Sequence, residues 1–165
     1  MDLYLMRHGA ALTKEEARVP EDAQRPLSPE GWATVRRVAD GLQSMGVRPS
    51  HLLTSPFLRA TQTASCVAEV LGSSARVEAC DALSPAHDPA DFQLQLDRFT
   101  KEEMLLVISH QPLLGQLVRG LVFGGTSQAG LSIPPAGVCA LWVPDPPSSG
   151  HAVIRGVWDP ELFLW

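Results

Sequence analysis

Near its N-terminus the chain reads LYLMRHG at residues 3–9, an apolar run that breaks abruptly into a cation, an imidazole and a glycine. Four consecutive apolar residues predict a short buried strand rather than a helix. In open α/β sheets, ligands bind just outside the carboxyl ends of the strands. Arg7 offers a planar fork of donors for phosphate or carboxylate oxygens, and His8 can act as a base, a ligand or a nucleophile. Gly9 allows the backbone to pass close to a ligand. A solvated surface turn is the alternative interpretation of the same tripeptide.

The bulk composition is that of a globular protein. The chain has 165 residues, of which 45% are hydrophobic, and we expect one domain spanning residues 1–165 with a full core. Its net charge of -5 and isoelectric point near 5.5 argue against nucleic acid or an anionic membrane as the main partner. Any positive charge that handles a phosphate must therefore be local.

Targeting and redox signals favour a cytoplasmic protein. No apolar run approaches the ~18 residues that cross a bilayer, and the first residues do not resemble a signal peptide. Three cysteines without CxxC spacing, Cys66, Cys80 and Cys139, indicate neither a disulfide framework nor a zinc site. His51, His87 and His151 have no partner at ligand spacing, so neither a metal nor another cofactor is predicted.

Hydrophobic periodicity and turn signals predict strands that alternate with helices. Residues 10–27 are polar and are expected to form a loop over the ligand end of the first strand, and the glycines of residues 120–130 a flexible loop. The predicted helix of residues 28–46 places Trp32 and Met45 on its apolar face. Ser55-Pro56 is expected to open a helix in the same way as Ser28-Pro29. The further predicted elements are strands at 51–54, 76–78 and 104–108, helices at 55–72, about 90–99 and 112–121, and an edge hairpin of strands 138–143 and 152–157. This alternation predicts a three-layer α/β/α sandwich with a mostly parallel central sheet.

Polar side chains follow three of the predicted strands. Arg7 and His8 follow the first strand, Arg59 lies in the first turn of the helix after the second, and His110 follows the central one. If these strands are parallel neighbours, all four side chains converge on one end of the sheet. Crowded cations repel one another unless an anion lies among them. The pattern therefore predicts an anion pocket, most naturally for a phosphoryl group, that works without a metal.

Such a pocket also suits a histidine nucleophile. An imidazole that ordinarily titrates near about 6.5 should have its pKa lowered by the neighbouring cations, which keeps it neutral at cellular pH. The attacking nitrogen must carry no proton. The other ring nitrogen is therefore expected to donate to a backbone carbonyl or a similar acceptor.

With these residues the chain resembles the histidine phosphatase, or phosphoglycerate-mutase-like, superfamily, whose defining tripeptide is Arg-His-Gly. Its short length and several phrases are similar to the bacterial SixA-type phosphohistidine phosphatases. These phrases are MRHG at 6–9, RPL at 25–27, SPFLRATQT at 55–63 and VISHQPL at 107–113. The resemblance runs from the first strand to about residue 121 and is weak beyond it.

The resemblance implies a role for each matching residue. It implies that His8 attacks phosphorus and becomes transiently phosphorylated, that Arg7 and Arg59 bind the phosphoryl oxygens, and that His110 donates to the phosphoryl group. Gly9 would lie at the bound substrate. Arg25 occupies the place of an arginine near the substrate entrance, and a solvated loop charge is its alternative interpretation. Ser55 is expected to be a helix cap.

Many members of the superfamily place a Glu or Asp after the third strand as the general acid for an alcohol leaving group. Asp81 and Asp88 are the candidates here, and loop residues that satisfy turn amides are the alternative. Lack of a clear acid matters less for phosphohistidine, because its imidazole is basic and can leave already protonated. We therefore predict a metal-independent phosphatase for phosphohistidine proteins, such as a phosphorelay domain.

Two other functions remain open. One is a phosphomonoesterase of the same superfamily that acts on small phosphorylated molecules, with Asp81 or Asp88 pointing into the pocket. The other is a non-catalytic module that binds phosphate or a phosphoprotein. Intact His8 and His110 argue against the second, because binding alone would need only the arginines. A mutase is disfavoured, because such enzymes carry long insertions for which this chain has little room.

Overall fold

The computed structural model describes residues 1–72, 75–124 and 131–163. Within these residues six strands form one sheet in the order β3-β2-β4-β1-β5-β6. The strands are β1 (Asp2–Arg7), β2 (His51–Thr54), β3 (Arg76–Ala79), β4 (Met104–Ser109), β5 (Val138–Trp142) and β6 (Val153–Trp158). Strands β1 to β4 run parallel, whereas β5 is antiparallel to β1 and β6 to β5. The predicted mostly parallel sheet with a hairpin at its edge is confirmed.

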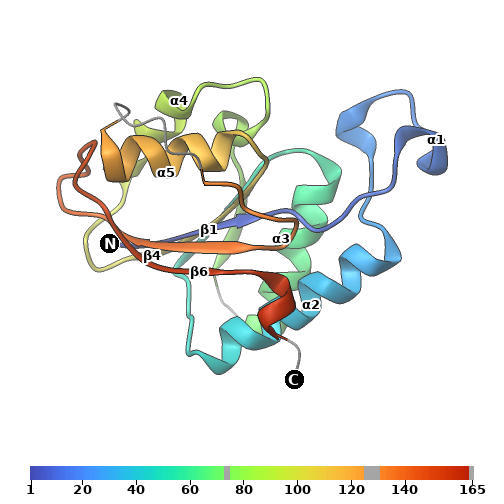
Figure 1. The fold of residues 1–165 in the computed structure, drawn as a ribbon, viewed down its shortest axis with the longest axis horizontal. Coiled ribbons are helices and arrows are strands. Elements are labelled where there is room, and N and C mark those ends of the chain that lie inside the picture. The colour runs from blue at the N-terminus through green and yellow to red at the C-terminus, as the bar shows by residue number, and fades with distance from the viewer. Residues whose placement is uncertain (73–74, 125–130, 164–165) are drawn as a thin grey trace.

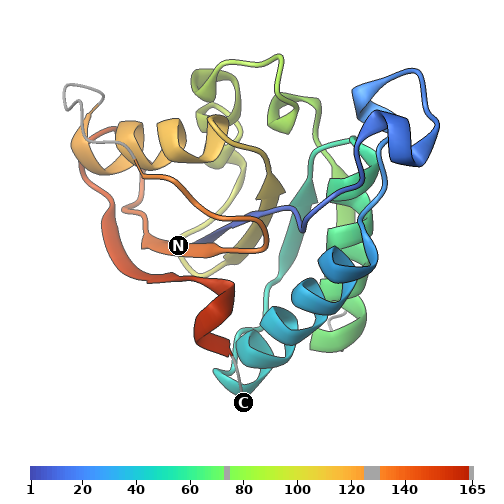
Figure 2. The same cartoon turned by 45° about the vertical axis from the view of Figure 1, so that its right-hand side comes forward.

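Helices cover both faces of this sheet. The α-helices are α1 (Lys14–Ala17), α2 (Pro29–Ser44), α3 (Leu58–Leu71), α4 (Pro89–Gln93) and α5 (Leu113–Phe123). Short 3-10 turns are η1 (Asp22–Gln24), η2 (Asp81–Leu83), η3 (Leu96–Arg98) and η4 (Pro160–Phe163). Helices α2 and α3 pack together on one face, and α4 and α5 lie over the other (Figures 1 and 2). The three-layer α/β/α sandwich is thereby confirmed.

The two central strands are buried on both faces, which explains their continuous apolar sequences. Successive side chains of a strand point to opposite faces. Accordingly Leu5 and Val107 belong to the core under α5, while Met6 and Ile108 belong to the core under α2 and α3. All four side chains are fully buried, and each such burial stabilises the fold by about 1.5–3 kcal/mol.

Helix α2 forms as predicted, but two of its expected core residues do not reach the core. Trp32 is 39% exposed and Met45 is 47% exposed. The buried stripe of α2 is centred between Val38 and Ala39. At about 100° per residue, Trp32 falls near the margin of that stripe. Met45 is on the same side as Val38, but it is the C-cap residue beyond the last residue of α2, so helical spacing alone overstated the burial of both.

The prediction that Ser55-Pro56 caps and opens the next helix is wrong. Helix α3 begins at Leu58, and its N-cap position is Phe57, without a side-chain cap. The hydroxyl of Ser55 instead lies 2.8 Å from Nε2 of His110. The hydroxyl of Ser55 therefore bonds a residue that follows the neighbouring strand β4, and it also accepts from the amide of Phe57 at 3.4 Å.

Two further boundaries differ from the sequence prediction. The helix expected at about 90–99 is divided into α4 and η3, because amides there bond three residues back, Arg98 to Gln95 and Phe99 to Leu96, both at 3.1 Å. Helix α5 runs to Phe123, so the loop expected at residues 120–130 starts later, and residues 125–130 lie outside the described residues. No helix within the described ranges is long and apolar enough to cross a membrane.

Candidate active site

Strand register brings the predicted site residues to one edge of the sheet. Ile108 of β4 is in register with both Met6 of β1 and Thr54 of β2, so the residues that follow these three positions are neighbours. Two backbone hydrogen bonds continue the alignment: the His8 amide donates to Ser109 at 3.1 Å, and the Ser55 amide donates to Ile108 at 2.9 Å. The segment of residues 10–27, with α1, projects at this same end (Figure 1).

A cavity of about 490 Å³ opens at this edge. Five of the predicted residues line it, namely Arg7, His8, Arg25, Arg59 and His110. Asp22, from the segment 10–27, also lines the cavity. The sequence analysis did not identify Asp22 as a candidate site residue. The chemical roles that the sequence assigned to these residues remain predictions.

The hydrogen bonds of His8 determine which ring nitrogen carries the proton. Nδ1 lies 2.7 Å from the carbonyl oxygen of Gly9, and because a carbonyl only accepts, Nδ1 is the donor. Nε2 therefore carries no proton, and it accepts from Nε of Arg59 at 3.2 Å. The expected hydrogen bond to a backbone carbonyl is confirmed, and it leaves Nε2 without a proton, which is the state that a nucleophilic imidazole requires.

The pKa of His8 is lowered to about 4, so the imidazole is neutral at physiological pH. Burial is the main cause, and the positive charges of Arg59, Arg7 and Arg25 add to it. The sequence argument attributed the shift to the cations alone. It missed the larger contribution because burial depends on the packed fold.

His110 is a second neutral imidazole beside the first. It is 3% exposed, and its ring centroid lies 4.8 Å from that of His8. Nδ1 accepts from Nη2 of Arg59 at 3.4 Å, so Nε2 carries the proton and donates it to Oγ of Ser55 at 2.8 Å. Burial, followed by the neighbouring His8 and Arg59, lowers the pKa of His110 to about 3.

Arg7 holds an unsatisfied donor in this cluster of cations. Its Nη1 donates to the carbonyl of Ile133 at 3.1 Å, whereas its buried Nε has no hydrogen-bond partner in the described part of the chain. Burial and the nearby Arg59 both lower the pKa of Arg7. A buried donor without a partner costs free energy, and an anionic ligand is the natural acceptor for it here.

Arg59 and Arg25 are both engaged by Asp22. Arg59 donates from Nη1 to the backbone oxygen of Asp22 at 2.7 Å and from Nη2 to its Oδ2 at 2.8 Å. Arg25 donates from Nη1 to Oδ1 of the same carboxylate at 2.8 Å. These bonds, from Arg25 first and then from Arg59, hold the pKa of Asp22 below its usual range. The only local signal for Asp22 is its position three residues before Arg25, since Arg59 is 37 residues away.

Gly9 lies beside the pocket rather than in its wall. A Cβ at this position would lie 2.6 Å from Cγ2 of Val35 and 3.0 Å from the oxygen of Gly31. Its amide donates to Oγ1 of Thr63 at 3.1 Å. Packing against α2 therefore requires the glycine, which is a different reason from the ligand approach that the sequence suggested.

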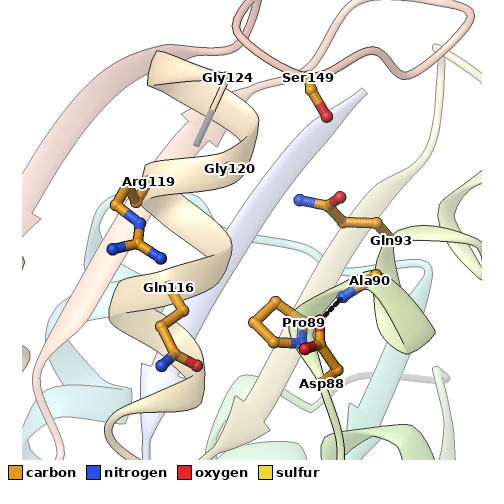
Figure 3. Close-up of a pocket in the computed structure, with 9 residues that line it drawn as sticks. All are labelled: Asp88, Pro89, Ala90, Gln93, Gln116, Arg119, Gly120, Gly124 and Ser149. Atoms are coloured by element: carbon orange, nitrogen blue, oxygen red, sulfur yellow. Dashed lines mark hydrogen bonds between the residues drawn. The ribbon is translucent and has the colours of Figure 1, made fainter. Parts of the chain in front are cut away.

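Neither predicted general-acid candidate lines the cavity. Asp81 is exposed at the start of η2. Asp88 caps α4 by accepting from the amide of Ala90 at 2.9 Å, and it lines a separate pocket of about 310 Å³ between α4 and α5, opposite Arg119 (Figure 3). Among the described residues, Asp22 is the one carboxylate in the wall of the His8 cavity.

Comparisons with known proteins agree with this arrangement. Residues 3–85 match the family model of the histidine phosphatase superfamily (branch 1). The chain is 36% identical over 128 residues to the phosphohistidine phosphatase SixA of Escherichia coli K12, covering 76% of this chain and 77% of that one. An uncharacterized protein of Picosynechococcus is 36% identical over 167 residues, covering 99% of this chain and 94% of that protein. The structure of the protein histidine phosphatase SixA complexed with tungstate is similar with a TM-score of 0.86 at 28% identity, over 98% of this chain and 99% of that one.

Proposed function

We propose that this chain, which belongs to branch 1 of the histidine phosphatase superfamily, hydrolyses phosphohistidine on proteins through a transiently phosphorylated His8. One observation carries the proposal. His8 presents an unprotonated Nε2 to a cavity whose guanidinium groups come from Arg7, Arg25 and Arg59. The similarity of this chain to SixA in sequence and fold supports the same reaction class.

In the first step, Nε2 of His8 forms a bond to phosphorus as the phosphorus–nitrogen bond of the substrate breaks. The electron pair of that bond goes to the departing imidazole nitrogen. The imidazole leaves neutral if its other ring nitrogen already carries a proton. Donors from Arg7 and Arg59 stabilise the charge on the phosphoryl oxygens during the transfer. The three guanidinium groups outnumber the Asp22 carboxylate by two charges, which matches a phosphoryl group of about −2.

In the second step, water attacks phosphorus and the bond to His8 breaks. The electron pair returns to Nε2, and the proton of the water goes to the departing phosphate. Without substrate, His110 is a neutral imidazole beside His8. A phosphoryl dianion raises the pKa of a neighbouring imidazole, so His110 becomes a stronger donor to the phosphoryl oxygens only when substrate is bound.

The protonation state of Asp22, the carboxylate at the cavity, supports the choice of substrate class. The hydrogen bonds from Arg25 and Arg59 keep Asp22 ionised at neutral pH, so it holds no proton for an alkoxide. Esters such as phosphoserine need that proton, whereas the imidazole of phosphohistidine is basic enough to acquire its own. The proposed partner is therefore a protein that carries phosphohistidine, such as a phosphorelay domain.

The test measures phosphate release from a phosphohistidine peptide and a phosphoserine peptide side by side in excess EDTA. His8→Ala is the catalytic variant. His151→Ala is the matched control, because His151 is exposed, does not line the cavity, and bonds to the backbone oxygen of Ser149 in the hairpin turn. Release from phosphohistidine that is lost in His8→Ala alone is the expected result. Equal or faster release from phosphoserine would instead favour a phosphomonoesterase, and no release from either would favour a binding module.

A further inference from the structure

Asp22 lies at the mouth of the cavity, outside the arginine that it binds. The Arg59 side chain is 6% exposed, whereas that of Asp22 is 50% exposed. The carboxylate therefore lies between the buried guanidinium and solvent. Arg25 holds its other oxygen at 2.8 Å, so this position is fixed from two sides.

Four of the five N–H donors of Arg59 are engaged in this arrangement. Nε donates to His8, Nη1 to the backbone oxygen of Asp22, and Nη2 to the carboxylate of Asp22 and to His110. A phosphoryl group bound at Nε2 of His8 needs donors from the same guanidinium. It therefore competes with Asp22 for this guanidinium, while Arg25 can still hold the carboxylate of Asp22.

The direction of the reaction brings the leaving group towards this carboxylate. In an in-line displacement the leaving group departs opposite the attacking nitrogen. His8 and Asp22 line the same cavity, and Asp22 is the more exposed of the two, so a leaving group that departs from His8 towards solvent comes near the carboxylate. We propose that Asp22 determines leaving-group specificity: its carboxylate accepts a hydrogen bond from the distal, protonated ring nitrogen of the departing imidazole. This inference rests on the proposed function, and it names Asp22 as the residue that makes the enzyme prefer phosphohistidine to phosphate esters.

The carboxylate of Asp22 acts by favouring the protonated form of the leaving imidazole. The distal nitrogen of phosphohistidine must be protonated for the ring to leave as neutral imidazole, and an adjacent carboxylate favours that protonated form. Asp22 itself gains no proton. An ester such as phosphoserine has no such N–H group, so it meets the negative charge of Asp22 without a compensating hydrogen bond.

The experiment compares Asp22→Asn with Glu21→Gln as the matched control. Glu21 is the exposed neighbouring carboxylate, and it does not line the cavity. For the wild type and both variants, kcat/KM is measured for a phosphohistidine peptide and for p-nitrophenyl phosphate. Asp22→Asn should lower the phosphohistidine-to-ester ratio about tenfold or more, as expected for one lost charge-assisted hydrogen bond. Glu21→Gln should leave the ratio unchanged. A ratio that is unaltered in Asp22→Asn would overturn the proposal.

Binding of inorganic phosphate separates this inference from the proposed function. Isothermal titration calorimetry should show about tenfold tighter phosphate binding by Asp22→Asn, because a like charge that competes for Arg59 has been removed, and no change in Glu21→Gln. Unchanged phosphate affinity in Asp22→Asn would refute the competition for Arg59. If the wild type released no phosphate from phosphohistidine, the proposed function and the leaving-group assignment would both fall. Tighter phosphate binding by the variant would then still identify Asp22 as the internal competitor.

Discussion

Acidification from pH 7 to pH 5 should destabilise the fold through two histidines, the buried His110 and the partly buried His8. Histidine in an unfolded chain titrates near about 6.5, whereas the folded pKa values of His8 and His110 are about 4 and about 3. The unfolded state therefore takes up protons first as the pH falls. The stability that depends on neutral histidines is fully present above about pH 6.5 and is lost progressively as the pH falls towards about 4.

The size of the effect follows from the pKa difference. At pH 5, about 1.5 units below the unfolded value, each histidine alone would lower the free energy of unfolding by about 2 kcal/mol. His8 is only partly buried, and its ring centroid lies 4.8 Å from that of His110, so the two contributions are coupled. We expect a combined loss of about 2–4 kcal/mol.

Urea denaturation of the wild type and of the double variant His8→Asn/His110→Asn, each at pH 7 and pH 5, measures this loss. Carboxylates such as Asp22 titrate in both proteins and cancel in the comparison. The wild type should lose about 2–4 kcal/mol more than the double variant. An equal loss in both proteins would refute the conclusion that the two imidazoles are buried in their neutral form.

Four further perturbations test individual contacts. Gly9→Ala should cost about 1–3 kcal/mol in urea denaturation because its Cβ collides with Val35, and adding Val35→Ala should reduce that penalty; two fully additive losses would contradict the packing explanation. Ser55→Ala removes the acceptor for His110, so kcat should fall about tenfold with little change in KM, and an unchanged kcat would show that this hydrogen bond does not position the ring. Arg59→Lys should lower kcat/KM at least about a hundredfold, because lysine cannot reproduce the planar fork of donors; near wild-type kinetics would remove Arg59 from phosphoryl binding. Inorganic phosphate at 100 times its dissociation constant should stabilise the wild type by about 2.7 kcal/mol in thermal unfolding, and no stabilisation would argue against an anion site.

The convergence of the site could be predicted because it depends on topology alone. Arg7 is the last residue of β1, His8 and His110 directly follow β1 and β4, and strands of one parallel sheet end at a common edge. Arg59 joins them because its helix starts at that same edge. None of these placements requires knowledge of side-chain packing, and residue type at a strand end was therefore enough to find them.

Contacts between distant segments explain what the sequence did not reveal. Ser55-Pro56 is locally equivalent to Ser28-Pro29, yet only Ser28 is the N-cap of its helix. Helix α3 begins later, at Leu58, and the hydroxyl of Ser55 contacts Nε2 of His110. Asp22 likewise looks like an ordinary charge in a polar loop, and its function depends on Arg59, 37 residues away. Local propensity cannot distinguish such residues, since the partner that changes their role is fixed only by the fold.

The distribution of polar groups along the central strands separates stability from function. The interiors of β1 and β4 are wholly apolar, as Leu5 and Val107 show, and they make the core. The residues at their carboxyl ends do not add to this stability. The buried Nε of Arg7 has no hydrogen-bond partner in the described part of the chain and costs folding free energy, and His8 and His110 destabilise the fold as the pH falls. A sequence selected for stability alone would continue the apolar run by one or two residues. Among the described residues, buried Nε atoms without a partner also occur at Arg37 and Arg119, but at this edge such a donor lies with two neutral imidazoles around one cavity. That combination indicates that the edge is maintained for a ligand.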